Sequence, residues 1–173
     1  MLAQGVAVLI IILLGIGGQA KTQKMFLFSQ LIVNTLYVLH YVLLSATTAV
    51  AVCIVCVLRT LIFYLYRRAD KDAPIWLLTI IFIVVIGAGL VTWQNMLSIL
   101  PVLATISFTY GQWQHNIQTT RKTAIAGNVG WVIYNLFCFA YVDLIGKIVE
   151  ITSYAIAMYR HDKGKTTNYI PTQ

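Results

Sequence analysis

The sequence contains few charged side chains. Of its 173 residues, 12 are Lys or Arg and 5 are Asp or Glu, so about 10% are charged, whereas a soluble domain averages roughly 25%. It also has only three prolines and three cysteines. Because its apolar fraction is 60% and its mean hydropathy is +0.82, the composition argues against a soluble enzyme and predicts a surface that faces lipid.

The cysteines and the net charge exclude further classes. Cys53, Cys56 and Cys138 all lie in apolar runs, where no disulfide framework is expected. The Cys53–Cys56 spacing suits a metal or redox pair, but no second pair completes four ligands, so we expect packing residues, no metal and no cofactor. The net charge of +7 does not indicate nucleic acid, because the basic residues are divided among the apolar blocks.

The chain divides into seven apolar blocks, each close to the roughly 20 residues that cross a bilayer as a helix. This pattern predicts an all-α integral membrane protein with seven transmembrane helices. The first block resembles a signal peptide, but no Lys or Arg precedes it, so we interpret it as a retained helix. Asp143, read as an N-cap, is the only local signal that separates the last two blocks. The blocks are 3–18, 25–44, 47–66, 74–93, 95–113, 124–141 and 143–159.

The basic residues predict the orientation of these helices. Ten of the twelve lie after the first, third and fifth blocks or in the tail, and the intervening gaps hold none. Because positive residues in short loops stay cytoplasmic, we expect a periplasmic N-terminus and a cytoplasmic C-terminus. The ten are Lys21, Lys24, Arg67, Arg68, Lys71, Arg121, Lys122, Arg160, Lys163 and Lys165.

The first three and the last three blocks share short motifs near their ends, and these motifs indicate an internal repeat. Gly18–Gln19 recurs as Gly111–Gln112, and Tyr66–Arg67 recurs as Tyr159–Arg160, both at an offset of 93 residues. Two triple-helix units with one helix between them enter the membrane from the same side, which is typical of transporters with a site between the halves. The predicted organisation is a first repeat over 1–68, a linker helix over 69–94, a second repeat over 95–160 and a disordered cytoplasmic tail over 161–173.

Three segments of the second repeat carry a family resemblance: Thr105–Gln112, Arg121–Thr123 and Trp131–Tyr134. They resemble the triple-helix unit of the SWEET and semiSWEET sugar carriers and the PQ-loop proteins, with Gly-Gln where that unit usually has Pro-Gln. The 3-1-3 helix order also resembles the PnuC carriers of vitamin precursors. Over nearly its whole length the chain is similar to the small bacterial inner-membrane proteins of the YgjV type. The resemblance implies the bacterial inner membrane and a small polar solute bound between the repeats.

Few chargeable side chains fall inside the expected spans, and each needs a partner or water. Lys147 shares a helical face with Asp143 and Glu150, so one interpretation is local neutralisation within the last helix. In the other interpretation Glu150 faces the interior of the bundle, at the position where the SWEET-like unit commonly has a substrate-binding asparagine. A carboxylate at that position would favour a cationic or proton-coupled solute. Arg59 is either a snorkelling structural residue or a partner of the substrate or of Glu150.

Several uncharged residues are candidates for the same site. Trp131 matches the tryptophan that lines the pocket in the second helix of the SWEET-like unit, and Asn34 occupies the equivalent place in the first repeat. Both residue types also pack or hydrogen-bond between helices without any ligand. His40 could relay protons or simply bond a neighbouring helix. Weaker candidates of the same kind are Tyr37, Tyr134 and Asn135.

Two functions compete at this point. The first is a small-solute carrier that exposes a central site alternately to each side of the lipid bilayer. The second is a non-transporting scaffold or regulatory protein, which the same fold would allow. No nucleophile–base pair or metal cluster lies in the spans, so no enzymatic activity is expected. The sequence leaves open whether the fused pair of repeats works alone or as a homo-oligomer.

Overall fold

All regular secondary structure is helical in the part of the chain that the computed structural model describes, which comprises residues 2–45, 47–91, 93, 96–139 and 141–166. The sequence-based prediction of an all-α fold is therefore confirmed for these residues. The elements are α1 (Leu2–Gly18), α2 (Gln23–Leu43), α3 (Thr47–Arg68), α4 (Ile75–Val91), the short 3-10 helix η1 (Met96–Ser98), α5 (Ile99–Trp113), α6 (Ile117–Phe137) and α7 (Tyr141–Thr166).

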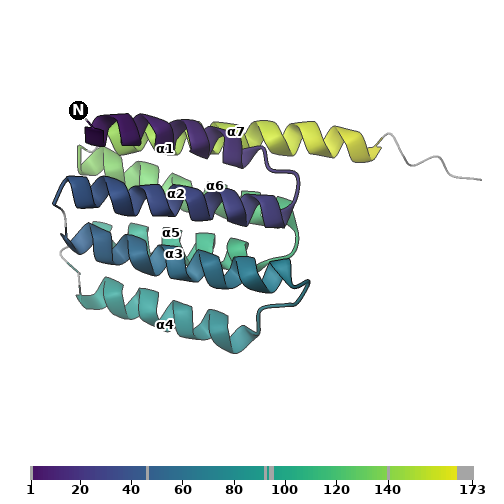
Figure 1. The fold of residues 1–173 in the computed structure, drawn as a ribbon, viewed down its shortest axis with the longest axis horizontal. Helices are drawn as coiled ribbons and strands as arrows, with labels where there is room; N and C mark the ends of the chain where they lie inside the picture. The colour runs from purple at the N-terminus through teal and green to yellow at the C-terminus, as the bar shows by residue number, and fades with distance from the viewer. Residues whose placement is uncertain (1, 46, 92, 94–95, 140, 167–173) are drawn as a thin grey trace, which may run out of the picture.

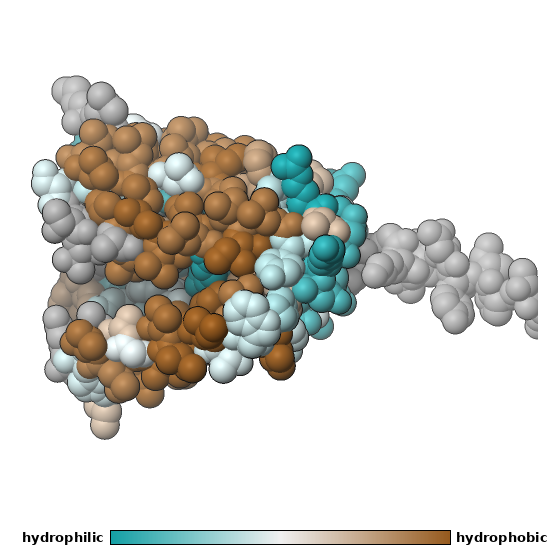
Figure 2. Space-filling model, turned by 60° about the horizontal axis from the view of Figure 1, so that its bottom comes forward, coloured by the Kyte–Doolittle hydropathy of each residue, from teal (hydrophilic) through white to brown (hydrophobic). Residues whose placement is uncertain are grey.

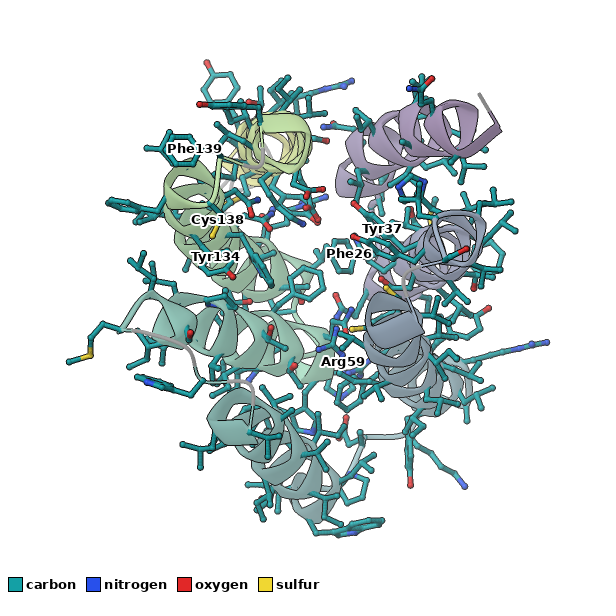
Figure 3. All side chains as sticks on the ribbon, turned by 90° about the vertical axis from the view of Figure 1, so that its left-hand side faces the viewer. Phe26, Tyr37, Arg59, Tyr134, Cys138 and Phe139 are labelled. Carbon is teal, nitrogen blue, oxygen red and sulfur yellow. The ribbon has the colours of Figure 1, made fainter. Side chains whose placement is uncertain are left out.

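Six helices form a ring, and α4 lies outside it (Figures 1 and 3). The helices α1, α2, α3, α5, α6 and α7 each contact the next in that order, and α7 returns to α1. Short connections make helices that follow one another in the sequence run in opposite directions, so the C-terminal ends of α1, α3, α5 and α7 lie at one end of the molecule (Figure 1). We call this the basic end, because the predicted cytoplasmic segments gather there, and the other the opposite end.

Local capping chemistry sets several helix boundaries. Thr22 caps α2 by accepting a hydrogen bond from the Met25 amide at 3.3 Å, and Asn116 caps α6 by accepting one from the Gln118 amide at 2.9 Å. A left-handed residue closes the C-terminal end of three helices, a conformation usually given to glycine. These residues are Ser45 after α2, Asp70 after α3 and Phe139 after α6, with φ values of 55°, 53° and 57°.

The largest differences from the expected boundaries lie in the last two helices. The sixth helix begins at Ile117 rather than at 124, because Asn116 caps two polar turns that an apolar-run criterion overlooks. The last helix begins at Tyr141, so Asp143 lies in its first turn and is not its N-cap. That helix continues to Thr166, into the segment 161–173 that was expected to be disordered, and residues 167–173 lie outside the described residues.

Much of the surface is apolar. Figure 2 shows hydrophobic residues over the length of the bundle and hydrophilic ones gathered at the basic end. Proteins that fold in water rarely expose so continuous an apolar surface. Among the described helices, only the segment Gln23–Leu43 is both long and apolar enough to cross a membrane by itself, and α1 and α4 are apolar but shorter. Seven crossings therefore stay a prediction. Exposed examples are Ile16, Phe28, Val52, Ile83, Leu103 and Ile148.

Two glycines allow close helix contacts around the second half of the ring. Gly127 of α6 lies against α5, where an added Cβ would come within 2.8 Å of the carbonyl oxygen of Ala104. Gly89 of α4 lies against Val102 of α5 in the same way, whereas Gly87 has open space beside it. Of these two glycines of α4, only Gly89 therefore makes a close contact, which attaches α4 to the outside of the ring.

Candidate functional site

A cavity of about 250 Å³ lies inside the ring. All six ring helices contribute to its lining, and α4 contributes none. Seen from the opposite end in Figure 3, Tyr37 and Arg59 lie between the two halves of the ring, α1–α3 and α5–α7. The position of this cavity makes it the default candidate for a binding site.

The cavity collects most of the residues that the sequence analysis selected. The two exceptions are Tyr134, whose ring meets that of Trp131 with centroids 5.8 Å apart, and His40. His40 lines a separate cavity of about 50 Å³, and its Nδ1 lies 3.0 Å from the carbonyl oxygen of Ala3. The selected residues that line the central cavity are Trp131, Glu150, Asn34, Arg59, Asn135 and Tyr37.

Further polar residues of the lining were not selected from the sequence. Gln30 lies four residues before Asn34 on α2, and Asn128 lies three residues before Trp131 on α6. Residues three or four apart share a helical face, so extending the two selected faces by one turn would have found both. Cys53 and Cys56 also line the cavity, as free thiols.

The cavity extends along α7 from the molecular surface to the middle of the bundle. Asp143, at the opposite end, lines it and is exposed. Glu150 also lines it but is only 2% exposed. These residues are seven positions apart, which corresponds to about 10 Å along a helix. The cavity therefore reaches the surface at the opposite end and ends deep inside the protein.

An aromatic layer closes the cavity toward the basic end. Phe26 of α2 lies between Tyr154 of α7 and Phe108 of α5, with ring centroids 5.9 Å and 6.4 Å away. Phe26 and Tyr154 are completely buried. Because the three rings come from both halves of the ring of helices, the layer spans the space between the halves and blocks the path to the basic end.

Among the hydrogen bonds that join the two halves, two side-chain contacts correspond to each other. Gln19 Nε2 donates to the carbonyl oxygen of Ser153 at 2.7 Å and to its Oγ at 3.0 Å. Thr60 and Gln112 exchange hydrogen bonds at 3.3–3.4 Å. Gln112 follows Gln19 by 93 residues, and Ser153 follows Thr60 by the same offset. The two contacts therefore occupy corresponding positions of the predicted repeats.

Two buried arginines also connect the halves at the basic end. Arg121, which was expected in a water-facing loop, lies within α6, is completely buried and donates from Nη2 to the carbonyl oxygen of Ala20 at 2.6 Å. Arg67 is 7% exposed and donates from Nη2 to the carbonyl oxygen of Trp113 at 3.2 Å. Both guanidinium groups link the two halves, so these two cations are structural parts of the basic end.

The acidic group in the deep part of the cavity has close partners. Glu150 accepts a hydrogen bond from Lys147 Nζ at 3.0 Å and another from the Tyr154 hydroxyl at 2.5 Å. Tyr154 in turn accepts a hydrogen bond from Gln30 at 3.3 Å. Glu150 is thus neutralised on its own helix and also lines the cavity, so the two interpretations of this residue describe one arrangement.

The guanidinium group of Arg59 has different surroundings. Arg59 is 7% exposed, and its Nη1 donates to Thr109 Oγ1 at 2.8 Å. Its Cζ lies 5.9 Å from the ring centroid of Phe108. The ion pairs found within the described residues do not include Arg59. The cavity therefore offers hydrogen bonds, charge and aromatic faces for binding.

Among the described residues, no group of three or more His, Cys, Asp and Glu side chains comes together to hold a metal ion. Neither the comparison with curated proteins nor the comparison with solved structures finds a match. The chain does match the Imp-YgjV family, described as bacterial inner membrane protein, over residues 1–165. Because this match covers almost the whole chain, the protein belongs to the Imp-YgjV family of bacterial inner membrane proteins.

Proposed function

We propose that the protein is a small-solute carrier that exposes the central cavity alternately to the two sides of the inner membrane. The observation that carries this proposal is the cavity itself, which lies between α1–α3 and α5–α7 and takes polar and aromatic side chains from both halves. Sites between repeats are characteristic of secondary transporters. Movement of one half against the other would close the opposite end and open the basic end.

The proposal includes seven membrane crossings, a periplasmic N-terminus and a cytoplasmic C-terminus. The exposed apolar surface and the gathering of the basic segments at one end support this orientation. In this orientation the described conformation is open to the periplasm. Reporter fusions at the two termini test it, because both reporters on the same face of the membrane would contradict an odd number of crossings.

The contacts at the basic end support two repeated triple-helix units. Gln19 of the first half bonds Ser153 of the second half, and Gln112 of the second half bonds Thr60 of the first. Gln112 follows Gln19 by 93 residues, and Ser153 follows Thr60 by the same offset, so each contact pairs the same two positions of the repeat. This arrangement is what a twofold axis between two similar units produces. In a carrier, these two contacts would break together when the basic end opens.

A scaffold or regulatory role is the second candidate. The specific observation in its favour is the amount of buried hydrogen bonding between the halves, to which the buried Arg67 and Arg121 contribute. Such a network suits a bundle that never opens. A scaffold needs no solute path, so substitutions inside the cavity would leave its activity unchanged as long as the protein folds.

Uptake profiling separates these functions. A deletion strain and the complemented strain are compared for uptake of a panel of small metabolites, and solutes that differ are then tested in proteoliposomes. The double variant Trp131→Ala/Glu150→Gln removes two cavity groups and should abolish uptake of such a solute while the protein remains inserted. The control Trp76→Ala/Asp70→Asn removes the same kinds of group at exposed positions and should transport normally.

Unchanged uptake in the cavity variant would contradict the carrier. So would the lack of any solute whose uptake differs between the two strains. Because Glu150→Gln leaves Lys147 without its partner, Trp131→Ala alone is measured as well, and we expect it to reduce uptake at least tenfold.

A further inference from the structure

The charge of Arg59 is not balanced inside the cavity. A guanidinium group stays protonated in proteins, and Arg59 is 93% buried with a neutral hydroxyl, Thr109 Oγ1, as its hydrogen-bond acceptor. The described residues place no carboxylate within 4.0 Å of it. A buried charge without a counter-charge is costly, so this position suits an arginine whose partner arrives from outside the protein.

The acids of the cavity do not supply that partner. Glu150 already accepts from Lys147 at 3.0 Å and from Tyr154 at 2.5 Å. Asp143 lies about 10 Å further out along α7, where it is exposed. The deep part of the cavity thus holds two cations, Arg59 and Lys147, against one anion, and an entering solute meets a net positive charge there.

Two hydrogen-bond donors of the lining are also unused. Arg59 Nε and Asn128 Nδ2 are both buried, and neither has a hydrogen-bond partner in the described part of the chain. Arg59 belongs to α3 in the first half of the ring, and Asn128 to α6 in the second. Buried donors are normally satisfied, and these two belong to residues that line the cavity from opposite halves.

We propose that the cavity binds an anionic solute through a carboxylate or phosphate group, with Arg59 and Asn128 donating to its oxygens. A neutral acceptor such as a sugar hydroxyl would fill the unused hydrogen bonds but would leave the charge unbalanced, whereas an anion does both. The guanidinium fork matches the planar carboxylate and the phosphate oxygens. This inference rests on the proposed central solute site, and it reverses the sequence-based expectation that Glu150 would favour a cation.

The remaining lining restricts the body of the solute. Trp131, Tyr37 and Phe108 contribute aromatic faces to the cavity, which pack against apolar or ring-shaped groups. The volume of about 250 Å³ lies below the roughly 300–1,000 Å³ of pockets for drug-sized ligands. The expected ligand is therefore a small anionic metabolite.

Matched pairs of anions and neutral analogues test the charge preference on the unmodified protein. The full chain in detergent micelles is titrated with lactate and lactamide, benzoate and benzamide, succinate and succinamide, and glycerol 3-phosphate and glycerol, with binding measured by calorimetry. We expect at least one anion to bind at least tenfold more tightly than its neutral partner. The pair that responds distinguishes a carboxylate from a phosphate. Neutral analogues that bind equally well, or no binding by any anion, would overturn the proposal.

Variants assign the binding to the expected donors. Arg59→Gln should weaken binding of the responding anion at least tenfold, Arg59→Lys less, and Asn128→Ala by two- to tenfold. The control Arg68→Gln removes an arginine from an exposed position on the same helix and should bind normally. Undiminished binding by folded Arg59→Gln protein contradicts the assignment. If Arg59→Gln does not fold, the matched pairs on the unmodified protein still decide the question.

Transport measurements separate this inference from the proposed function. If the responding anion binds but is not carried into proteoliposomes, the anion site stands and the carrier function fails. If a neutral solute is carried equally well by the unmodified protein and by Arg59→Gln, the carrier function stands and the anion preference fails.

Discussion

The two ends of the central cavity are built differently. Toward the basic end, buried aromatic rings and polar side chains fill the space between the halves, and Phe26, Tyr154 and Gln112 are completely buried. At the opposite end the lining includes Asp143, which is exposed. One end is therefore assembled as a closed contact between two halves and the other as an entrance.

This difference shows which contacts a carrier would have to break. In the proposed mechanism the described conformation receives a solute from the periplasm, and the hydrogen bonds of Gln19 and Gln112 hold the cytoplasmic path shut. Each such bond contributes about 1 kcal/mol to stability, so the closed end is stable but can open at a moderate cost.

Locking the closed end covalently should have the largest effect. Thr60→Cys/Gln112→Cys, placed in a protein whose three native cysteines are replaced, is bridged with a short bis-thiosulfonate reagent, which forms a reducible disulfide with each cysteine. Because the two positions belong to opposite halves, we expect the bridge to abolish uptake of the carried solute and a reducing agent to restore it. The measurement is uptake into proteoliposomes before and after reduction.

A second bridge provides the control for this lock. Lys24 and Asp70 form an exposed ion pair at 2.8 Å on the side of the first half, so a bridge between Lys24→Cys and Asp70→Cys does not join the halves. We expect uptake to continue with this bridge in place. Continued uptake with the Thr60–Gln112 bridge would mean that the basic end does not need to open.

Removal of a hydroxyl below the cavity should have an intermediate effect. Tyr154→Phe deletes the donor to Glu150 and leaves Gln30 without its acceptor. Hydrogen bonds to charged groups contribute about 1.5–3 kcal/mol, and we expect the free energy of unfolding in mixed micelles to fall by that amount. Tyr141→Phe, at an exposed position near the opposite end of the same helix, should change it by less. Equal effects of the two substitutions would argue against a specially stabilised closed end.

Glycine substitutions on α1 compare the ends directly and should have the smallest effect. A Cβ at Gly18, at the basic end, would lie 2.9 Å from Ser153 Cβ and 3.0 Å from Tyr154 Cδ1, whereas one at Gly5 meets nothing within 4 Å. We expect Gly18→Ala to lower the free energy of unfolding by about 1–2 kcal/mol through overpacking. Gly5→Ala should leave it unchanged or raise it by up to about 1 kcal/mol. A loss of stability at both positions would contradict the difference between the ends.

The main elements could be predicted from the sequence because hydropathy encodes them. Seven apolar runs correspond to the seven α-helices of the described residues, since each run must be removed from water as a helix. Glu150 and Arg59 could also be selected, because a charged side chain in an apolar run has to face the interior of the bundle. Trp131 was selected from the family resemblance. The ring of helices then directs such faces toward one cavity.

What hydropathy does not encode could not be predicted. The start of α6 depends on the cap of Asn116 before two polar turns, and the turn into α7 depends on the left-handed backbone of Phe139. A bulky residue rarely adopts the left-handed backbone conformation, so the local sequence does not predict it at Phe139. The burial of Arg121 was likewise hidden, because its acceptor, the carbonyl oxygen of Ala20, is 101 residues away in the sequence.

The unbalanced charge of Arg59 was also hidden in the sequence. The spacing of Lys147 and Glu150 indicates that the two can pair, but it does not exclude Arg59 as a competing partner of Glu150. Thr109, which accepts from Arg59, is 50 residues away, and Tyr154 completes the surroundings of Glu150. Which acid neutralises which base depends on tertiary contacts that one sequence does not reveal.

Accessibility of the native thiols tests most directly whether the cavity opens away from the basic end. In Cys138→Ser protein, Cys53 and Cys56 of the cavity are the remaining thiols, and a variant without cysteines gives the background. A membrane-impermeant thiol reagent is added to right-side-out and to inside-out vesicles. We predict that the cavity thiols react at least tenfold faster from the periplasmic side. Equal rates from both sides, or faster reaction from the cytoplasmic side, would contradict the account.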